Sequence, residues 1–104
     1  MNEDRNLKQI LFSIGLAKKA GKVISGTDSV CDEIRKHKIL LVLCACDVSE
    51  NTKKKISDCC KYYQIKLHFC GIPKETLGKA IGKTFSACIG ITDKNLSELI
   101  SRNI

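Results

Sequence analysis

An uninterrupted apolar run, from Ile39 to Cys46, constrains the fold more than any other feature of the chain. A strand that is apolar at every position, rather than at alternate ones, must be covered on both faces. The run is far shorter than the roughly 20 apolar residues that a membrane-spanning helix needs, so we expect no membrane partner. It therefore predicts a central strand between two layers of helices.

The segments around this run have helical patterns. Apolar residues spaced three and four apart predict an amphipathic helix over about residues 4–19. Thr27 and Ser49 are the expected N-caps of a second and a third helix, and Pro73 is placed to begin a short fourth one. Asp93 is the expected N-cap of the last helix.

Extended segments separate these helices. Besides the central run, the expected strands span residues 22–25, 67–70 and 85–91. Strands that alternate with helices predict an α/β fold in which helices cover both faces of one sheet. We therefore expect residues 1–104 to form a single domain, a three-layer α/β/α sandwich with a mixed four-stranded sheet.

The charge of the chain indicates its class of partner. It has 18 Lys and Arg against 11 Asp and Glu, a formal net charge of +7. The basic residues are spread along the sequence rather than collected in a tail, so the excess belongs to the folded surface and favours phosphate-rich partners. Aromatic residues make up 5% and there is no Trp, which argues against the base-stacking platform of single-strand binders.

The seven cysteines are predicted to be reduced. Their number is odd and the polar first residues do not resemble a signal peptide, so we expect a cytoplasmic protein without disulfides. No Cys-x-x-Cys pair occurs, and we predict no metal and no cofactor. Cys44 and Cys46, which would point the same way from a strand, are expected to be small core residues.

No group of residues in the sequence indicates catalysis. His37 is expected to be a cation near a helix end and His68 an ordinary strand residue. The segment from Gly78 to Lys83 lacks the spacing of a phosphate-binding loop, and its two glycines, Gly78 and Gly82, are expected to allow close packing on one helix face. We predict that the protein is not an enzyme and has no small-molecule substrate.

The start of the second helix, Gly26-Thr27-Asp28-Ser29, is the strongest candidate site. A helix N-terminus offers free backbone N–H groups to a phosphate, and the carboxylate of Asp28 can accept hydrogen bonds from guanine N1 and N2. The same residue types are also common caps, so the residues alone leave both interpretations open.

Three stretches, residues 15–30, 40–49 and 77–83, resemble in the same order the kink-turn RNA-binding ribosomal protein family of the L-seven-Ae and L-thirty-e type. The opening Gly-Leu-Ala-Lys-Lys-Ala-Gly-Lys is most similar to its small bacterial YlxQ-like branch. The resemblance extends over most of the chain, from about Leu7 to Asp93. It implies a protein that reads a sharply bent RNA stem with tandem G·A pairs.

The resemblance also implies where the RNA lies. The second helix start would enter the major groove, with Gly26, Thr27, Asp28 and Ser29. The loop before the fourth helix would hold an extruded nucleotide, with Cys70, Gly71, Ile72, Pro73, Lys74 and Glu75. Lys22 matches a basic position of the family that would meet phosphate. We further expect Lys18 and Lys19, together with Lys79 and Lys83, to position phosphates.

Two positions differ from the typical family pattern. Asp28-Ser29 stands where kink-turn binders carry Asn-Glu or Lys-Gln, and Asp32 stands where they have lysine; a carboxylate facing phosphate adds repulsion. Our leading hypothesis is a monomer that binds structured RNA, ribosomal or ribosome-associated, without catalysis. The alternatives are a protein-interaction module on the same fold with little RNA affinity, and an enzyme or redox sensor that uses its thiols.

Overall fold

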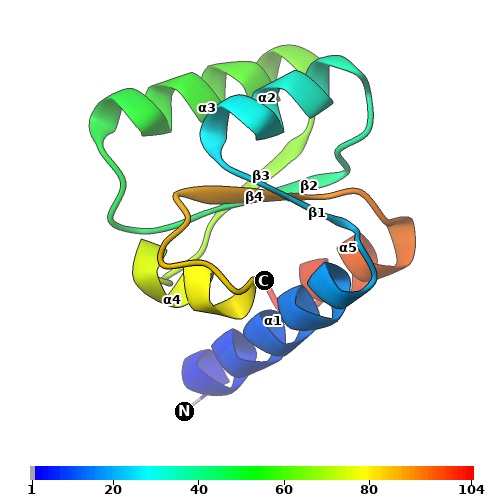
Figure 1. Ribbon diagram of the computed structural model, residues 1–104, viewed down its shortest axis with the longest axis vertical. Coiled ribbons are helices and arrows are strands. Elements are labelled where there is room, and N and C mark those ends of the chain that lie inside the picture. The colour runs from blue at the N-terminus through cyan, green and yellow to red at the C-terminus, as the bar shows by residue number, and fades with distance from the viewer. Residues whose placement is uncertain (1) are drawn as a thin grey trace.

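The computed structural model describes residues 2–104, with side chains from residue 6 onward. Five helices and four strands alternate along the described chain (Figure 1). The helices are α1 (Asn2–Lys19), α2 (Thr27–Arg35), α3 (Glu50–Tyr63), α4 (Lys74–Ala80) and α5 (Lys94–Ser101). The strands are β1 (Val23–Ser25), β2 (Leu41–Cys44), β3 (Lys66–Phe69) and β4 (Cys88–Ile91).

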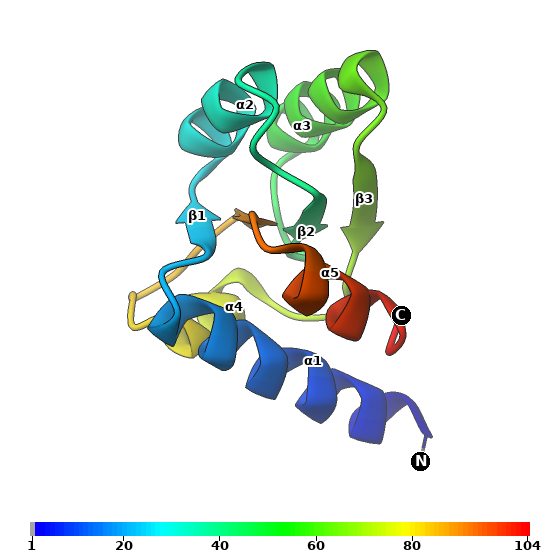
Figure 2. The ribbon, with the colours of Figure 1, turned by 90° about the vertical axis from the view of Figure 1, so that its right-hand side faces the viewer.

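The four strands form one mixed sheet in the order β1-β4-β2-β3. β4 runs antiparallel to both of its neighbours, and β3 runs parallel to β2. Helices α2 and α3 cover one face of the sheet, and α1, α4 and α5 cover the other (Figure 2). The predicted three-layer α/β/α sandwich with a mixed four-stranded sheet is confirmed.

The central strand β2 divides the interior into two cores. Leu41 and Leu43 point to the side of α1, α4 and α5, and Val42 and Cys44 point to the side of α2 and α3. Successive residues of a strand face opposite sides of a sheet. All four side chains are fully buried because helices cover both sides. As predicted from the sequence, the run is continuously apolar because both faces of this strand are buried. The strand itself spans only Leu41–Cys44.

The helix starts agree with the sequence in part. Ser49 and Asp93 are N-caps as predicted, since their side chains accept hydrogen bonds from the backbone N–H of Thr52 at 3.2 Å and Leu96 at 2.9 Å. Pro73 directly precedes α4, which begins at Lys74.

Three local expectations were wrong. Cys46 is exposed, because β2 ends at Cys44 and the two residues do not share a strand face. Gly82 lies outside α4, which ends at Ala80, so Gly78 and Gly82 do not form one helix face. The strand expected from Phe85 begins only at Cys88, and Phe85 is 63% exposed.

No helix within residues 2–104 is both long enough and apolar enough to cross a membrane.

Candidate nucleic-acid interface

Three helices begin at one end of the sheet, where the carboxyl ends of three strands lie. β1, β2 and β3 all run in the direction opposite to β4, so their carboxyl ends lie together with the amino end of β4. We call this the carboxyl edge, formed by residues 25–29, 44–49, 70–75 and 83–88. It lies at the left of Figure 1, where α2, α3 and α4 begin. Helix N-termini carry partial positive charge, so this edge is electrostatically suited to anions.

The start of α2 has no side-chain cap. Gly26 is the N-cap residue, with φ 97° and ψ 141°, a conformation that L residues rarely adopt. Its N–H donates to the carbonyl of Cys88 at 3.0 Å, which fixes the turn to the amino end of β4. Thr27 is therefore the first helical residue rather than the N-cap, and its hydroxyl oxygen lies 3.7 Å from the Cys88 sulfur. The prediction that Thr27 caps α2 was wrong.

The next two residues of α2 project outward. Asp28 and Ser29 are both exposed, whereas Val30 behind them is fully buried. Asp28 forms an ion pair with Lys55 of α3, whose ammonium donates to a carboxylate oxygen. This hydrogen bond, and then the positive charge of Lys55, lower the pKa of Asp28 below its ordinary value. Asp28 is thus held as an ionised hydrogen-bond acceptor.

The segment before α4 divides into buried and exposed residues. Cys70 and Ile72 are 1% and 2% exposed and belong to the core under the sheet. Gly71, Pro73, Lys74 and Glu75 are exposed. Of the residues that the resemblance implies for this loop, the structure thus brings these four to the surface and buries the other two.

The carboxylate of Asp47 fixes the start of α4. Its Oδ1 accepts a hydrogen bond from the backbone N–H of Lys74 at 2.8 Å. Pro73, the N-cap residue, makes no side-chain hydrogen bond to the helix. An acceptor from the turn after β2 therefore satisfies a donor that the helix itself leaves open.

The segment after α4 belongs to the same edge, although part of it was expected to form a strand. Lys83, Thr84 and Phe85 are exposed. Phe85 can take this position because Gly78 has no side chain: a Cβ on Gly78 would lie 2.4 Å from the Phe85 Cα. The polar residues on both sides of this phenylalanine are the signal that could have identified it as a surface residue.

A shallow hollow lies between this segment and the start of α4. Its volume is about 280 Å³, and Phe85 forms one side of it. The hollow is lined by Asp47, Pro73, Lys74, Glu75, Thr84 and Phe85.

Ser86 joins the two halves of the edge. Its N–H donates to the carbonyl of Lys74 at 2.9 Å, at the start of α4. Its hydroxyl lies 3.0 Å from the hydroxyl of Ser25, one residue before Gly26. The start of α2 and the hollow beside Phe85 are thus held at a fixed separation by hydrogen bonds.

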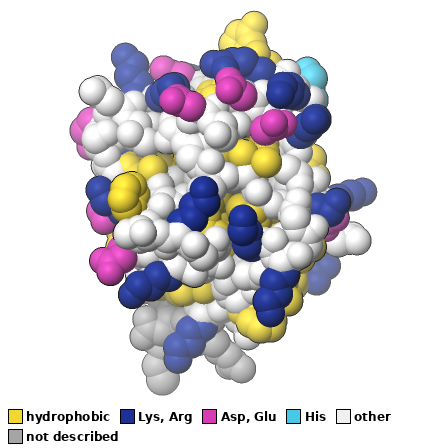
Figure 3. Space-filling model, viewed as in Figure 1, with side chains coloured by type: hydrophobic (Ala, Val, Ile, Leu, Met, Phe, Trp, Pro, Cys, Tyr) yellow, Lys and Arg dark blue, Asp and Glu magenta, His cyan; other side chains and the backbone are white. Residues whose placement is uncertain are grey.

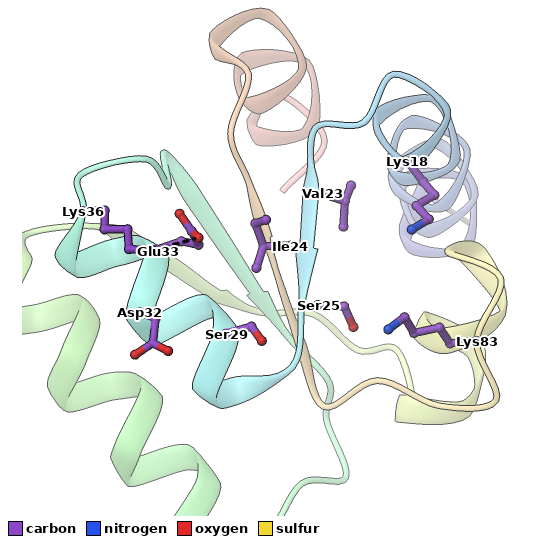
Figure 4. Close-up of a pocket in the computed structure, with 9 residues that line it drawn as sticks. All are labelled: Lys18, Val23, Ile24, Ser25, Ser29, Asp32, Glu33, Lys36 and Lys83. Carbon is purple, nitrogen blue, oxygen red and sulfur yellow. Dashed lines mark ion pairs between the residues drawn. The ribbon is translucent and has the colours of Figure 1, made fainter.

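The predicted phosphate-binding lysines lie in different places. Lys18 and Lys83 face a groove of about 390 Å³ beside β1, whose opposite wall carries Asp32 and Glu33 of α2 (Figure 4). Lys19 points to another side of α1. In Figure 3, basic side chains extend over both helix layers of this face, and most of the acidic ones lie in its upper part, over the α2 and α3 layer.

Two further lysines are separated from the start of α2. Lys22 lies at the amino end of β1, where its carbonyl accepts from Thr92, so the length of the strand lies between it and Gly26. Lys79 is exposed on α4 and forms an ion pair with Glu75 at 3.8 Å.

The buried thiols are poorly suited to chemistry. Burial raises the pKa of Cys31, Cys44 and Cys60 to about 12, so these groups stay protonated at neutral pH. A thiolate is the reactive form of cysteine, and a raised pKa depletes it. Within the described side chains, no group of three or more Cys, His, Asp or Glu residues is arranged to hold a metal ion.

Comparison with known proteins identifies relatives over most of the chain. Residues 8–101 match the model of a family described as ribosomal protein L7Ae/L30e/S12e/Gadd45. The RNA-binding protein YlxQ of Bacillus subtilis is 40% identical over 89 residues, which cover 85% of this chain and 88% of that protein. The RNA-binding protein YlxQ of Enterococcus faecium is 45% identical over 65 residues, which cover 62% of this chain and 62% of that protein.

Solved structures with the same fold include close and distant examples. A Bacillus halodurans protein of unknown function superposes with a TM-score of 0.87 at 32% identity, covering 91% of this chain and 95% of that one. The Giardia lamblia 15.5kD RNA binding protein has a TM-score of 0.77 at 15% identity, covering 95% of this chain and 84% of that one. The second likeness concerns the fold alone.

Proposed function

Because the chain belongs to the ribosomal protein L7Ae/L30e/S12e/Gadd45 family, in its bacterial YlxQ-like branch, we propose that it binds structured RNA and catalyses no reaction. Its Bacillus subtilis and Enterococcus faecium relatives are both RNA-binding proteins by name. The net charge of +7 supports a polyanionic partner.

The observation that carries the proposal is the joining of two surface features at the carboxyl edge. One is the uncapped start of α2, and the other is the hollow beside Phe85. The two hydrogen bonds of Ser86 hold them together. A site with two rigidly connected parts suits a folded RNA, whose shape is fixed, better than a flexible single strand.

Each part has its own chemistry in this proposal. The free N–H groups of the first turn of α2 receive a phosphate, and Asp28 accepts hydrogen bonds from guanine N1 and N2. The exposed ring of Phe85 stacks on an unpaired base in the hollow. Lys74 and Lys83 lie beside these groups and position the RNA backbone without reading its sequence.

This arrangement favours a bent stem over a straight one. In this proposal Asp28 binds a base edge and the hollow beside Phe85 holds a stacked base, and the distance between the two is fixed. A helical stem with an unpaired nucleotide next to it can occupy both at once. We therefore propose a kink-turn-like RNA with tandem G·A pairs, in ribosomal or ribosome-associated RNA of the cytoplasm, as the ligand.

A gel-shift series tests the proposal. The protein is titrated against a bent stem with tandem G·A pairs, a plain hairpin and a single strand, each at two salt concentrations. We expect a preference for the bent stem and a steep loss of affinity with salt. Equal and feeble binding to all three RNAs would refute specific RNA recognition.

Two kinds of variant separate the roles of the residues. Asp28→Ala is expected to reduce the preference for the bent stem several-fold, and Asp58→Ala, an exposed carboxylate of α3, serves as its control. Lys83→Ala and Lys22→Ala are expected to weaken all three RNAs alike, because phosphate contacts carry no sequence information. The reverse pattern would contradict these roles.

A further inference from the structure

The ion pair between Asp28 and Lys55 differs in kind from the others of the described structure. The remaining four pairs join residues three or four apart along a single helix, with the C-cap residue Lys36 counted to α2. Asp28 and Lys55 are 27 residues apart in the sequence and connect α2 with α3. It is thus the one described ion pair that joins two elements, and it involves the carboxylate that stands at the proposed RNA site.

Within the described structure, helix α2 has no cation in contact with this carboxylate. From Thr27 to Ile34 the helix has no lysine or arginine, and the first one, Arg35, binds Asp32 at 2.8 Å. Asp28 itself is 83% exposed as a side chain. Without Lys55, an exposed negative charge at the start of α2 would therefore face the RNA backbone with no partner in contact, and repel it.

We propose that the RNA-binding surface extends onto α3 through Lys55, which turns the Asp28 carboxylate toward base-edge donors and offsets its repulsion of phosphate. This inference rests on the proposed function and adds to it a specificity-determining residue outside α2 and the hollow.

The geometry lets Lys55 serve both purposes. Its ammonium has three donors, of which Asp28 uses one, so the others remain available for a phosphate oxygen. The Lys55 side chain is 52% exposed, and an ion pair in contact with water is weak enough to adjust when RNA approaches. Lys55 thus acts on recognition through Asp28 and on affinity directly.

A double-mutant cycle on the full chain tests this inference. Lys55→Ala, Asp28→Asn and the double variant are titrated against the bent stem and the plain hairpin. We expect Lys55→Ala to weaken the bent stem several-fold, to reduce the preference over the hairpin, and to lower the salt slope by about one. In the Asp28→Asn variant, residue 28 has no negative charge for Lys55 to offset. We therefore expect Lys55→Ala to have a smaller effect in that variant.

Lys54→Ala is the matched control, because Lys54 is the exposed neighbour of Lys55 on α3 and carries the same charge. It is expected to cause a small loss that is equal for both RNAs. Lys55→Arg is expected to retain the preference, since arginine also carries the charge. If Lys55→Ala behaves like Lys54→Ala, the inference is refuted while RNA binding by the wild type still stands. If the wild type shows no preference for the bent stem, the proposed function fails first and the inference fails with it.

A titration of the free protein checks the ion pair without RNA. The pKa of Asp28, followed by NMR, is expected to rise toward its ordinary value in Lys55→Ala, because the hydrogen bond and charge that lower it are gone. It is expected to stay low in Lys54→Ala. An equal pKa in the wild type and Lys55→Ala would show that the pair does not form, and would overturn the inference.

Discussion

The start of α2 and the segment before α4 lie at the same edge of one sheet, yet they are built in opposite ways. At the start of α2, Asp28 and Ser29 project into solvent from a turn that depends on one glycine. Before α4, Cys70 and Ile72 are buried, and hydrogen bonds tie the backbone to neighbouring segments. The first region presents side chains, whereas the second holds the edge together and presents only part of its length.

The difference shows that two segments to which the resemblance assigns RNA contacts need not be equally accessible at the surface. The resemblance implies RNA contacts throughout residues 70–75, but two of these six residues, Cys70 and Ile72, belong to the core. The structure makes the distinction testable, because changes in the supporting region should alter stability and changes in the presenting region should alter RNA recognition.

The largest effect is expected from Ile72→Ala in the supporting region. The side chain is 2% exposed, and removing it leaves a cavity that costs about 2–5 kcal/mol of unfolding free energy. Urea unfolding followed by circular dichroism measures this loss. The folded fraction is expected to keep its preference for the bent stem. A control, Gly71→Ala, adds a Cβ that meets no atom within 4 Å and is expected to be near neutral.

Gly26→Ala is expected to have an intermediate effect, and of a different kind. The added Cβ meets no atom within 4 Å, but φ 97° strains an L residue, at a cost of about 1–3 kcal/mol. The start of α2 is expected to shift in order to relieve the strain, so RNA preference falls together with stability. Unchanged stability and unchanged preference would remove the distinction between the two regions.

Asp47→Ala is expected to have the smallest effect of the three. It removes the acceptor for the Lys74 N–H, a loss comparable to that of a helix cap, about 1 kcal/mol. Asp47→Asn keeps an acceptor oxygen and is expected to recover most of the stability in the same urea experiment. A loss as large as that of Ile72→Ala would mean that the start of α4 depends on this single bond.

Much of the fold could be predicted because it follows from local patterns. The apolar run through Leu41 and Leu43 demands two covering layers, and the caps Ser49 and Asp93 have side chains that fit their role. The order of the strands could not be predicted, because the pairing of β4 between β1 and β2 depends on contacts between distant segments.

The candidate site was predicted less completely, for reasons that individual residues make plain. Thr27 is of a residue type that often caps helices, but Gly26, with its positive φ, is the N-cap and Thr27 is the first helical residue. Phe85 is of a residue type that is common in strands, but the close packing of its backbone on Gly78 holds it in an exposed loop. Lys55 could not be linked to Asp28, since only the packing of α2 on α3 brings them together.

The groove beside β1 has a consequence for encounters between identical molecules. Lys22, Ile24 and Gly26 direct their backbone groups toward β4, so the alternate positions Val23 and Ser25 leave an unpaired edge. Antiparallel pairing of two such edges in one continuous sheet would bring α2 of one copy beside α2 of the other, so that the groove walls carrying Asp32 and Glu33 would adjoin. The charges that flank β1 are therefore expected to disfavour self-association through its open edge, a route by which sheet proteins aggregate.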